Sequence, residues 1–371
     1  MRRLSPGVQY ERNESLFCGT CAARGVTCPG GAGPCHCIWD GADRHRCWDS
    51  KPCGVICQDR YDWRRHMENP RLVEAWTGMN AGPPVTRIPA YIPFGTLRIP
   101  VRPPSIEWLS LDARDLFYLR DRRGTPRPFT GSPTQIREAL GVAGDTKLLV
   151  YLNAPDPHLE RLWAAGRRIS GTLRDIGATL IGAPSFSMFL DRPRMDQIYN
   201  LRRMLTIWSE LVDEGLTPFP TLYACSEADL QRWAAWLADR PAVWLVGTTV
   251  QAREMDVFDD QVNQLVWLQR SVSLRVVPLH VVLHGAGPKR ALRARALGLR
   301  HFACTSAGPA MVAGRGGKRL VRVGGGFRRV PAPDLTRDQI FALNLRSHAE
   351  AFADIPLDPG GMIIPAVGMA A

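Results

Sequence analysis

Short apolar runs alternate with longer amphipathic stretches from about Lys147 onward. Runs of this length are typical of buried strands, whereas the apolar residues of the longer stretches recur at the three-to-four-residue spacing of a helix face. The predicted strands are KLLVYLN (147–153), ATLIGAPS (178–185), TPFPTLYA (217–224), AVWLVGTTV (242–250), LRVVPLHVVLHG (274–285) and HFACTS (301–306). Because continuously apolar strands that alternate with helices form parallel sheets, the pattern predicts an α/β protein.

Repeated strand–helix units build either a doubly wound sheet or a (β/α)8 TIM-like barrel, and we expect the barrel. Two further strands complete it, and they come either from the region 85–120 or from RLVRVGGGFRRV (319–330). The predicted domains are a Cys-rich metal-binding module (1–68), a Pro-rich extended or hairpin connection (69–145), the barrel catalytic domain (146–335) and a C-terminal helix and tail (336–371).

The chain carries a formal net charge of +12, and only four of its 47 basic residues are lysine. The planar guanidinium of arginine binds phosphate through paired hydrogen bonds, so the excess favours a polyanionic partner such as nucleic acid. The first residues, MRRLSPGVQYERNESLF, lack the apolar segment of a secretory signal, and GGMIIPAVGMAA near the C-terminus is too short to span a bilayer. We therefore expect a soluble, cytoplasmic protein without a membrane partner.

Eight of the ten cysteines fall in one Gly- and Pro-rich segment that is poor in aliphatic residues. They are Cys18, Cys21, Cys28, Cys35, Cys37, Cys47, Cys53 and Cys57. A reducing cytoplasm disfavours disulfides, and the segment cannot build an apolar core of its own, so we expect bound metal to hold it together. Eight thiolates, with His36 and His45 as substitutes, suffice for two structural zinc sites; a 4Fe-4S cluster is the alternative.

Small, polar and aromatic residues occupy the ends of the predicted strands, where α/β proteins place their functional groups. The candidates for substrate binding are Ser185, Phe186, Ser187, Phe189, Gln251, His284, Gly285 and Thr305. A planar ligand held between an aromatic face and hydroxyl or amide groups would fit this set. Each residue also has a structural alternative, the serines as helix caps and His284 as a half-buried histidine. Cys225 and Cys304 fit buried apolar positions better than reactive ones.

Four segments occur in a fixed order: LIGAPSFSMF (180–189), LVGTTVQ (245–251), HGAGP (284–288) and GLRHFAC (298–304). This order resembles that of the tRNA-guanine transglycosylase superfamily, over roughly residues 146–325, and most of all its deazapurine DNA-modification branch, the DpdA proteins. In that family the first segment is a base-binding loop and the second ends in a base-contacting glutamine. A glycine-rich turn follows, and then a strand of the type G-[hydrophobic]-D-x-F-D-[CS].

The resemblance implies a (β/α)8 barrel that exchanges guanine in nucleic acid for a 7-deazaguanine of the preQ0 type, with DNA favoured over tRNA. An aspartate attacks the anomeric carbon of the sugar and forms a covalent intermediate. The flipped base is held by its edge and stacked on an aromatic ring. By this resemblance Gln251 contacts the base, and the nucleophilic aspartate falls at position 303.

The chain departs from the family at that nucleophile, because position 303 is alanine. The aspartate of the base-binding loop is also missing, and Asp191 is the nearest carboxylate. Three explanations stay open: an inactivated variant, a natural non-catalytic relative, or a different acting carboxylate such as Asp191 or Asp256. The alternative functions are a zinc-containing nucleic-acid-binding protein without catalysis, a tRNA-directed base-exchange enzyme, and an iron–sulfur enzyme.

Overall fold

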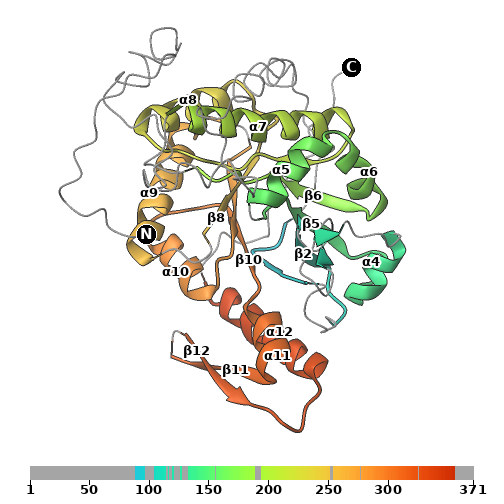
Figure 1. Ribbon diagram of the computed structural model, residues 1–371. Coiled ribbons are helices and arrows are strands. Elements are labelled where there is room, and N and C mark those ends of the chain that lie inside the picture. Colours follow the sequence, from blue (N-terminus) through green and yellow to red (C-terminus); the bar gives the residue numbers. More distant parts are fainter. Residues whose placement is uncertain are drawn as a thin grey trace, which may run out of the picture.

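The computed structural model describes most of the chain from residue 88 to residue 355. The described ranges are 88–96, 104–113, 116, 119–120, 126–127, 133–154, 156–188, 194–250, 254–275, 277–324 and 326–355. The predicted Cys-rich module (1–68) and the tail beyond residue 355 lie outside these ranges. Figure 1 shows the described elements, with helices arranged around a central group of strands.

Two four-stranded parallel sheets form the centre of the protein. The first has the order β2 (Trp108–Asp112), β5 (Lys147–Tyr151), β6 (Ala178–Gly182) and β7 (Pro218–Phe219). The second has the order β1 (Tyr91–Pro93), β10 (Phe302–Ser306), β9 (His280–His284) and β8 (Leu245–Thr249). The predicted α/β class with parallel strands is therefore confirmed.

Single bridges connect the two sheets at both of their edges. Phe94, just after β1, pairs in parallel with Ser110 of β2, and Thr221, just after β7, pairs in parallel with Gly247 of β8. Each of the eight strands is thus paired or bridged to the next one along the chain, and β10 is paired back to β1 through Tyr91 and Cys304. We call this arrangement the cyclic strand series.

The two strands that the repeating pattern left open both come from the region 85–120, as β1 and β2. They fall within the predicted Pro-rich connection, which also holds the short antiparallel pair β3 (Leu119–Arg120) and β4 (Pro126–Arg127). The other candidate segment, 319–330, forms an antiparallel hairpin instead, β11 (Lys318–Val323) and β12 (Gly326–Pro331). Its polar, alternating sequence suits a ribbon that faces solvent on one side.

The helices from α4 to α10 lie between strands of the cyclic strand series and cover its outside, whereas α11 leads to the β11–β12 hairpin and α12 follows it (Figure 1). They are α4 (Pro133–Leu140), α5 (Asp156–Ala165), α6 (Arg168–Asp175), α7 (Arg194–Asp213), α8 (Glu227–Ala238), α9 (Met255–Ser271), α10 (Pro288–Ala296), α11 (Gly308–Gly316) and α12 (Arg337–Ala353). Their starts carry sequence signals: Ser226 accepts a hydrogen bond from the Asp229 amide, and Thr336 and Gln339 form a capping box. Each such cap stabilises a helix by about 1 kcal/mol.

Alternate residues of the strands build two separate apolar layers. Leu148 and Val150 of β5 pack outward with the helices, whereas Leu149 and Tyr151 point inward. The inward residues of all eight strands meet in one group that we call the inner cluster, because side chains alternate along a strand. Its members are Ile88, Ile92, Trp108, Leu149, Tyr151, Leu180, Phe219, Leu245, Val282 and Ala303.

Two glycines make room for the aromatic side chains of the inner cluster. A Cβ atom at Gly247 would lie 2.5 Å from the Tyr151 hydroxyl and 2.5 Å from the Phe219 ring. A Cβ atom at Gly182 would lie 2.8 Å from the Tyr151 ring. Neither contact is sterically possible without movement of the rings. Glycine on β6 and β8 therefore allows Tyr151 and Phe219 to fill the space between the strands.

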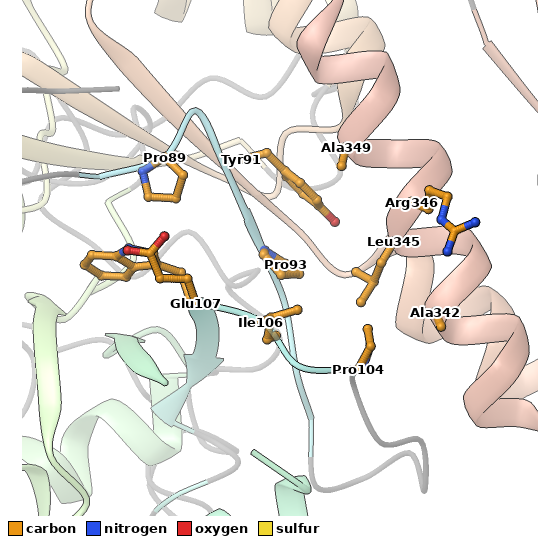
Figure 2. A pocket seen from close by; sticks show the side chains of 11 residues that line it. Pro89, Tyr91, Pro93, Pro104, Ile106, Glu107, Ala342, Leu345, Arg346 and Ala349 are labelled. Atoms are coloured by element: carbon orange, nitrogen blue, oxygen red, sulfur yellow. The ribbon is translucent and has the colours of Figure 1, made fainter. Parts of the chain in front are cut away.

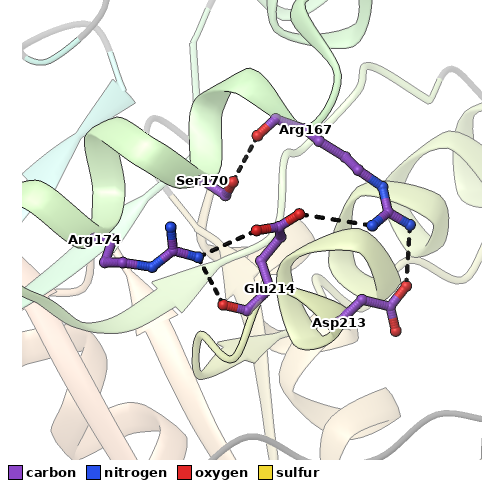
Figure 3. A network of polar contacts seen from close by, with 5 residues as sticks. All are labelled: Arg167, Ser170, Arg174, Asp213 and Glu214. Atoms are coloured by element: carbon purple, nitrogen blue, oxygen red, sulfur yellow. Dashed lines mark hydrogen bonds and ion pairs between the residues drawn. The ribbon is translucent and has the colours of Figure 1, made fainter.

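An ion-pair network ties both ends of α6 to the end of α7 on the outside of the protein (Figure 3). Arg167 lies 3.3 Å from Asp213 and 3.6 Å from Glu214, and Arg174 lies 3.2 Å from the same glutamate. The Ser170 hydroxyl donates to the Arg167 carbonyl at 2.6 Å. Both arginine side chains are more than half exposed, so the network orients the two helices with a modest gain in stability.

The C-terminal elements form a unit around a fully buried amide. The side-chain oxygen of Asn344 in α12 accepts a hydrogen bond from the Leu320 amide at 2.5 Å. Its side-chain nitrogen donates to the carbonyls of Pro309 and Lys318, each at 3.2 Å. These bonds join α12, the start of α11 and the start of β11. On its other side α12 packs against β1, where Tyr91 and Phe352 stack with ring centroids 4.6 Å apart.

Candidate functional site

Three buried polar side chains meet inside the cyclic strand series, at the carboxyl ends of β2, β9 and β10. His284 Nε2 lies 3.2 Å from Asp112 Oδ1, and His284 Nδ1 lies 2.8 Å from the Thr305 hydroxyl. All three side chains are at most 1% exposed. We call these residues the polar triad. The carboxyl ends of parallel strands are where α/β proteins bind ligands, so its position marks a candidate site.

Strand alternation explains why the triad points inward. Asp112 lies on the same face of β2 as Trp108, and His284 lies two residues beyond Val282 on β9. Thr305 lies two residues beyond Ala303 on β10. His284 and Thr305 each follow an inward apolar residue directly. Asp112 follows Trp108 and Ser110 on the same face, so the triad forms a polar layer that lies beyond the inner cluster along the strands.

Contacts at both ring nitrogens fix the position of the His284 imidazole. The Gly285 amide donates to the Thr305 hydroxyl at 3.3 Å, and that hydroxyl shares a hydrogen bond of 2.8 Å with Nδ1 of His284. The tautomer of a neutral ring in which Nδ1 accepts carries its proton on Nε2, the nitrogen nearest Asp112. The carboxyl and the imidazole thus lie side by side inside the cyclic strand series.

Tyr151 closes one side of the triad. Its ring stacks on His284, with centroids 4.3 Å apart and an angle of 16° between the planes. The centroids of the Tyr151 and Phe219 rings are 5.8 Å apart, and these two rings pack edge to face. Burial raises the pKa of the Tyr151 hydroxyl, and the charge of Asp112 raises it further. The phenol is therefore neutral at physiological pH and serves as a hydrogen-bonding group, not as a base.

The chemistry open to this arrangement is that of a positioned carboxylate. The His284 imidazole, with Nε2 only 3.2 Å from Oδ1, limits where the Asp112 carboxyl can lie. Such a group acts as a nucleophile or accepts a proton from a substrate. The hydroxyl of Thr305 holds the ring from behind, so the three side chains act as one positioned unit.

Known protein families offer no match. Neither family models nor curated protein sequences are similar to this chain.

The structure brings three of the predicted substrate-binding residues together: His284, Gly285 and Thr305. The sequence did not single out their two close neighbours, Asp112 and Tyr151. The signal for Asp112 was the strand-like segment WLSLD, which alternates apolar and polar residues and ends in a carboxylate. The signal for Tyr151 was an aromatic residue at the end of the run KLLVYLN.

The loop after β6 packs in a different layer from the triad. Phe186 is 1% exposed and belongs to the layer between the strands and the helices, where its ring lies 3.9 Å from the buried guanidinium of Arg203. Arg203 is in turn paired with Glu160 at 2.7 Å. Phe186 thus stacks on an internal arginine and not on a ligand at the triad. Ser185 and Ser187 are partly exposed, and the Ser187 carbonyl accepts from Asn200 at 2.8 Å.

Ala303, the position of the expected nucleophile, lies deeper than the triad. It is 1% exposed, belongs to the inner cluster and is paired in register with Val282. It precedes Thr305 by two residues on the same face of β10, so it lies about 7 Å further down the strand. A carboxylate there would lie among apolar side chains. Asp112 is the acidic side chain that the structure places in the polar layer.

The other predicted site residues fall into two groups. Phe189, Asp191 and Gln251 lie outside the described residues, as do the eight predicted metal ligands, Cys18, Cys21, Cys28, Cys35, Cys37, Cys47, Cys53 and Cys57. Asp256, the other carboxylate considered, is described: it is exposed in the first turn of α9, where it accepts the Val257 amide at 2.8 Å. It is therefore placed for a structural role at a helix start.

The two described cysteines have structural environments. Cys304 faces the helices and is fully buried, and burial raises the pKa of its thiol. A thiol that stays protonated is a poor nucleophile, so Cys304 fits the expected packing role. Cys225 is partly exposed, and neither cysteine is in a disulfide. Within the described ranges no three His, Cys, Asp or Glu side chains gather in a way that would hold a metal ion.

A groove of about 370 Å³ lies on the outer side of β1, away from the triad (Figure 2). Its walls are Tyr91 and Pro93 of β1, the segment that leads into β2, and one face of α12. Most lining side chains are apolar, with Glu107 and Arg346 at its edges. Because Tyr91 and Pro93 point away from the inner cluster, this groove and the triad are on opposite faces of the same strand. Among the described helices, none is long and apolar enough to cross a bilayer.

Proposed function

We propose that the cyclic strand series is a closed (β/α)8 barrel. Support comes from the pairing of β10 back to β1, from the bridges at Ser110 and Gly247, and from the single inner cluster that all eight strands share. In such barrels the site lies at the carboxyl ends of the strands, which is where Asp112, His284 and Thr305 meet.

We infer that the protein is a base-exchanging transglycosylase that replaces guanine in nucleic acid, DNA in preference to tRNA, by a 7-deazaguanine of the preQ0 type. The observation that carries this proposal is the buried Asp112 carboxylate beside His284 at the carboxyl ends of the strands. The resemblance of the four sequence segments supplies the reaction class. Asp112 supplies the carboxylate that position 303 lacks.

The proposed reaction is balanced in two steps. A carboxylate oxygen of Asp112 bonds to the anomeric carbon of the sugar, the glycosidic bond breaks, and the leaving nitrogen of guanine takes one proton from solvent. The incoming 7-deazaguanine returns one proton to solvent as its nitrogen bonds to the same carbon, and the bond to Asp112 breaks, which restores the carboxylate. His284 and Thr305 position the carboxylate through the contacts at 3.2 Å and 2.8 Å.

An exchange assay with labelled guanine, duplex DNA and tRNA tests the proposal. We expect label in DNA with the unaltered chain, and a loss of roughly a hundredfold or more for Asp112→Asn, because an amide cannot form the intermediate. Asp256→Asn is the matched control, since it makes the same change on an exposed helix turn, and it keeps full exchange. Absence of label in both nucleic acids overturns the proposal, and label only in tRNA moves the substrate to RNA.

A second candidate is a zinc-containing nucleic-acid-binding protein without catalysis. The specific observation in its favour is the alanine at position 303, buried in the apolar inner cluster. For either function we propose that the segment 18–57 holds two structural zinc ions, with a 4Fe-4S cluster as the alternative. Metal analysis of the purified chain, together with its visible absorption spectrum, distinguishes the two.

A further inference from the structure

The β11–β12 hairpin carries a dense positive charge without acidic residues. Between residues 308 and 331 the chain has six basic residues and no Asp or Glu. The basic residues are Arg315, Lys318, Arg319, Arg322, Arg328 and Arg329. Of these, Arg322 is neutralised by an ion pair with Asp354. In the described part of the chain the other five have no ion-pair partner, so their charge is available to a ligand.

One face of the hairpin is occupied by α12. Leu320 is 7% exposed there, and its carbonyl accepts the Ser347 hydroxyl at 3.2 Å. Phe327 stacks on His348 with centroids 4.6 Å apart and an angle of only 6° between the rings. These contacts fix the ribbon on the helix and leave the opposite face for solvent.

The opposite face combines arginine with aliphatic side chains. Cross-strand partners share a face, and Arg319 is paired with Val330 while Arg328 is paired with Val321. Both arginines are exposed, and Val323, further along the same face, is 55% exposed. Arg319 and Arg328 are diagonal neighbours, which places the two residues about 7–8 Å apart. We call this surface the basic ribbon face.

The ribbon is attached at the end of the protein that carries the triad. α11 begins at Gly308, whose amide donates to the side chain of Ser306, the last residue of β10. Thr305 of the triad is the neighbouring residue on that strand. Figure 1 shows the ribbon next to α11 and α12 and well separated from α7 and α8.

We propose that the basic ribbon face binds the backbone of duplex DNA. Phosphates of one strand rise by roughly 3.4 Å along the axis, and because the strand also winds around the axis, neighbouring phosphates are about 7 Å apart, which matches the spacing of the two arginines. A two-stranded ribbon fits the major groove of B-form DNA, which is about 12 Å wide, and not the narrow one of A-form RNA. The face has no aromatic side chain on which unpaired bases would stack. This surface would hold the DNA substrate of the proposed function, and the proposal rests on that function only for the choice of DNA.

Salt-dependent binding of a short labelled duplex by the full chain tests the proposal. We expect the double variant Arg319→Gln, Arg328→Gln to bind on the order of tenfold more weakly, with the slope of log K against log salt reduced by about 2. The matched control is Arg270→Gln, Arg300→Gln. It removes the same charge from exposed positions next to Gly298, at the opposite, amino end of β10.

The outcomes separate the possible partners. Equal losses in the two double variants overturn the proposal, because they reveal a general effect of net charge. A loss restricted to single-stranded DNA, to duplex RNA or to vesicles of anionic lipid also overturns it. Because this measurement needs no base exchange, a chain that fails to exchange guanine but binds DNA through Arg319 and Arg328 refutes only the proposed function.

Discussion

At the scale of single residues, position decides what each polar group can do. Asp112, His284 and Thr305 lie one layer above an apolar cluster, and each has a neighbour in the triad. Ala303 lies within that apolar cluster. Two residues along β10 therefore separate the polar layer of Thr305 from the apolar layer of Ala303, where a buried charge would be costly.

Ala303→Asp tests this difference directly. We expect the free energy of unfolding to fall by about 2–4 kcal/mol at pH 7, because the substitution buries a carboxyl among apolar side chains. Burial raises the pKa of that carboxyl in the folded state, so the loss grows as pH rises above about 4. Urea unfolding at pH 4.5 and pH 7.5 measures it, always relative to the unaltered chain.

Ala303→Asn is the control, since it introduces similar bulk and polarity without a titrating group. Its loss of stability should be the same at both pH values. If Ala303→Asp is fully stable and gains base exchange, the layer of Ala303 belongs to the active centre, and the chain is an inactivated form of the enzyme.

At the scale of secondary-structure elements, small residues determine how the strands and their side chains fit together. The two aromatic rings of the inner cluster occupy space that side chains on β6 and β8 would otherwise fill. Tyr151 reaches His284 only because of this space. The shape of the candidate site therefore depends on glycines that carry no chemistry themselves.

Gly247→Ala is expected to lower the free energy of unfolding by about 1–3 kcal/mol, because the new methyl group would lie 2.5 Å from both Tyr151 and Phe219. Gly171→Ala is the matched control. A Cβ atom there meets nothing within 4 Å, and Gly171 lies inside α6. The control should gain about 0.5–1 kcal/mol from helix propensity. Denaturant unfolding of both variants checks the pair, and a loss in both would mean that backbone flexibility, not crowding, is responsible.

The elements that could be predicted from sequence are those with long apolar runs. Each of the six predicted segments contains one of the observed strands β5 to β10, in the same order. β1 could not be located, because it is three residues long and ends in a proline, and its partner β10 is distant in sequence. Asp112 was missed for the same reason, since its strand was not separated from the Pro-rich connection. Phe186 shows a further limit: beyond the end of a strand, alternation no longer says which way a side chain points.

At the scale of the whole molecule, buried histidines make stability depend on pH. Burial lowers the pKa of His280 to about 3, with a smaller contribution from nearby His301, and lowers the pKa of His348 to about 4. Both are neutral when folded, whereas the unfolded chain binds protons below about pH 6.5. Acidification therefore favours the unfolded state.

We expect the free energy of unfolding to fall as pH is lowered from about 6.5 towards 4, by up to about 1.4 kcal/mol per pH unit for each histidine. Urea unfolding at several pH values measures this slope. His348→Gln should make the slope shallower, whatever its effect on stability at pH 7. An unchanged slope would show that other groups, chiefly carboxylates, govern acid unfolding.

The pairing of β1 with β10 also constrains how the protein can be made. Tyr91 is paired with Cys304, so the first strand of the series acquires one of its two neighbours only after roughly 200 more residues have left the ribosome, on the order of 10–40 s of synthesis. Until then the edge of β1 is open to pairing with other chains. The order of the strands along the chain therefore leaves this edge unpaired for most of the synthesis of the series.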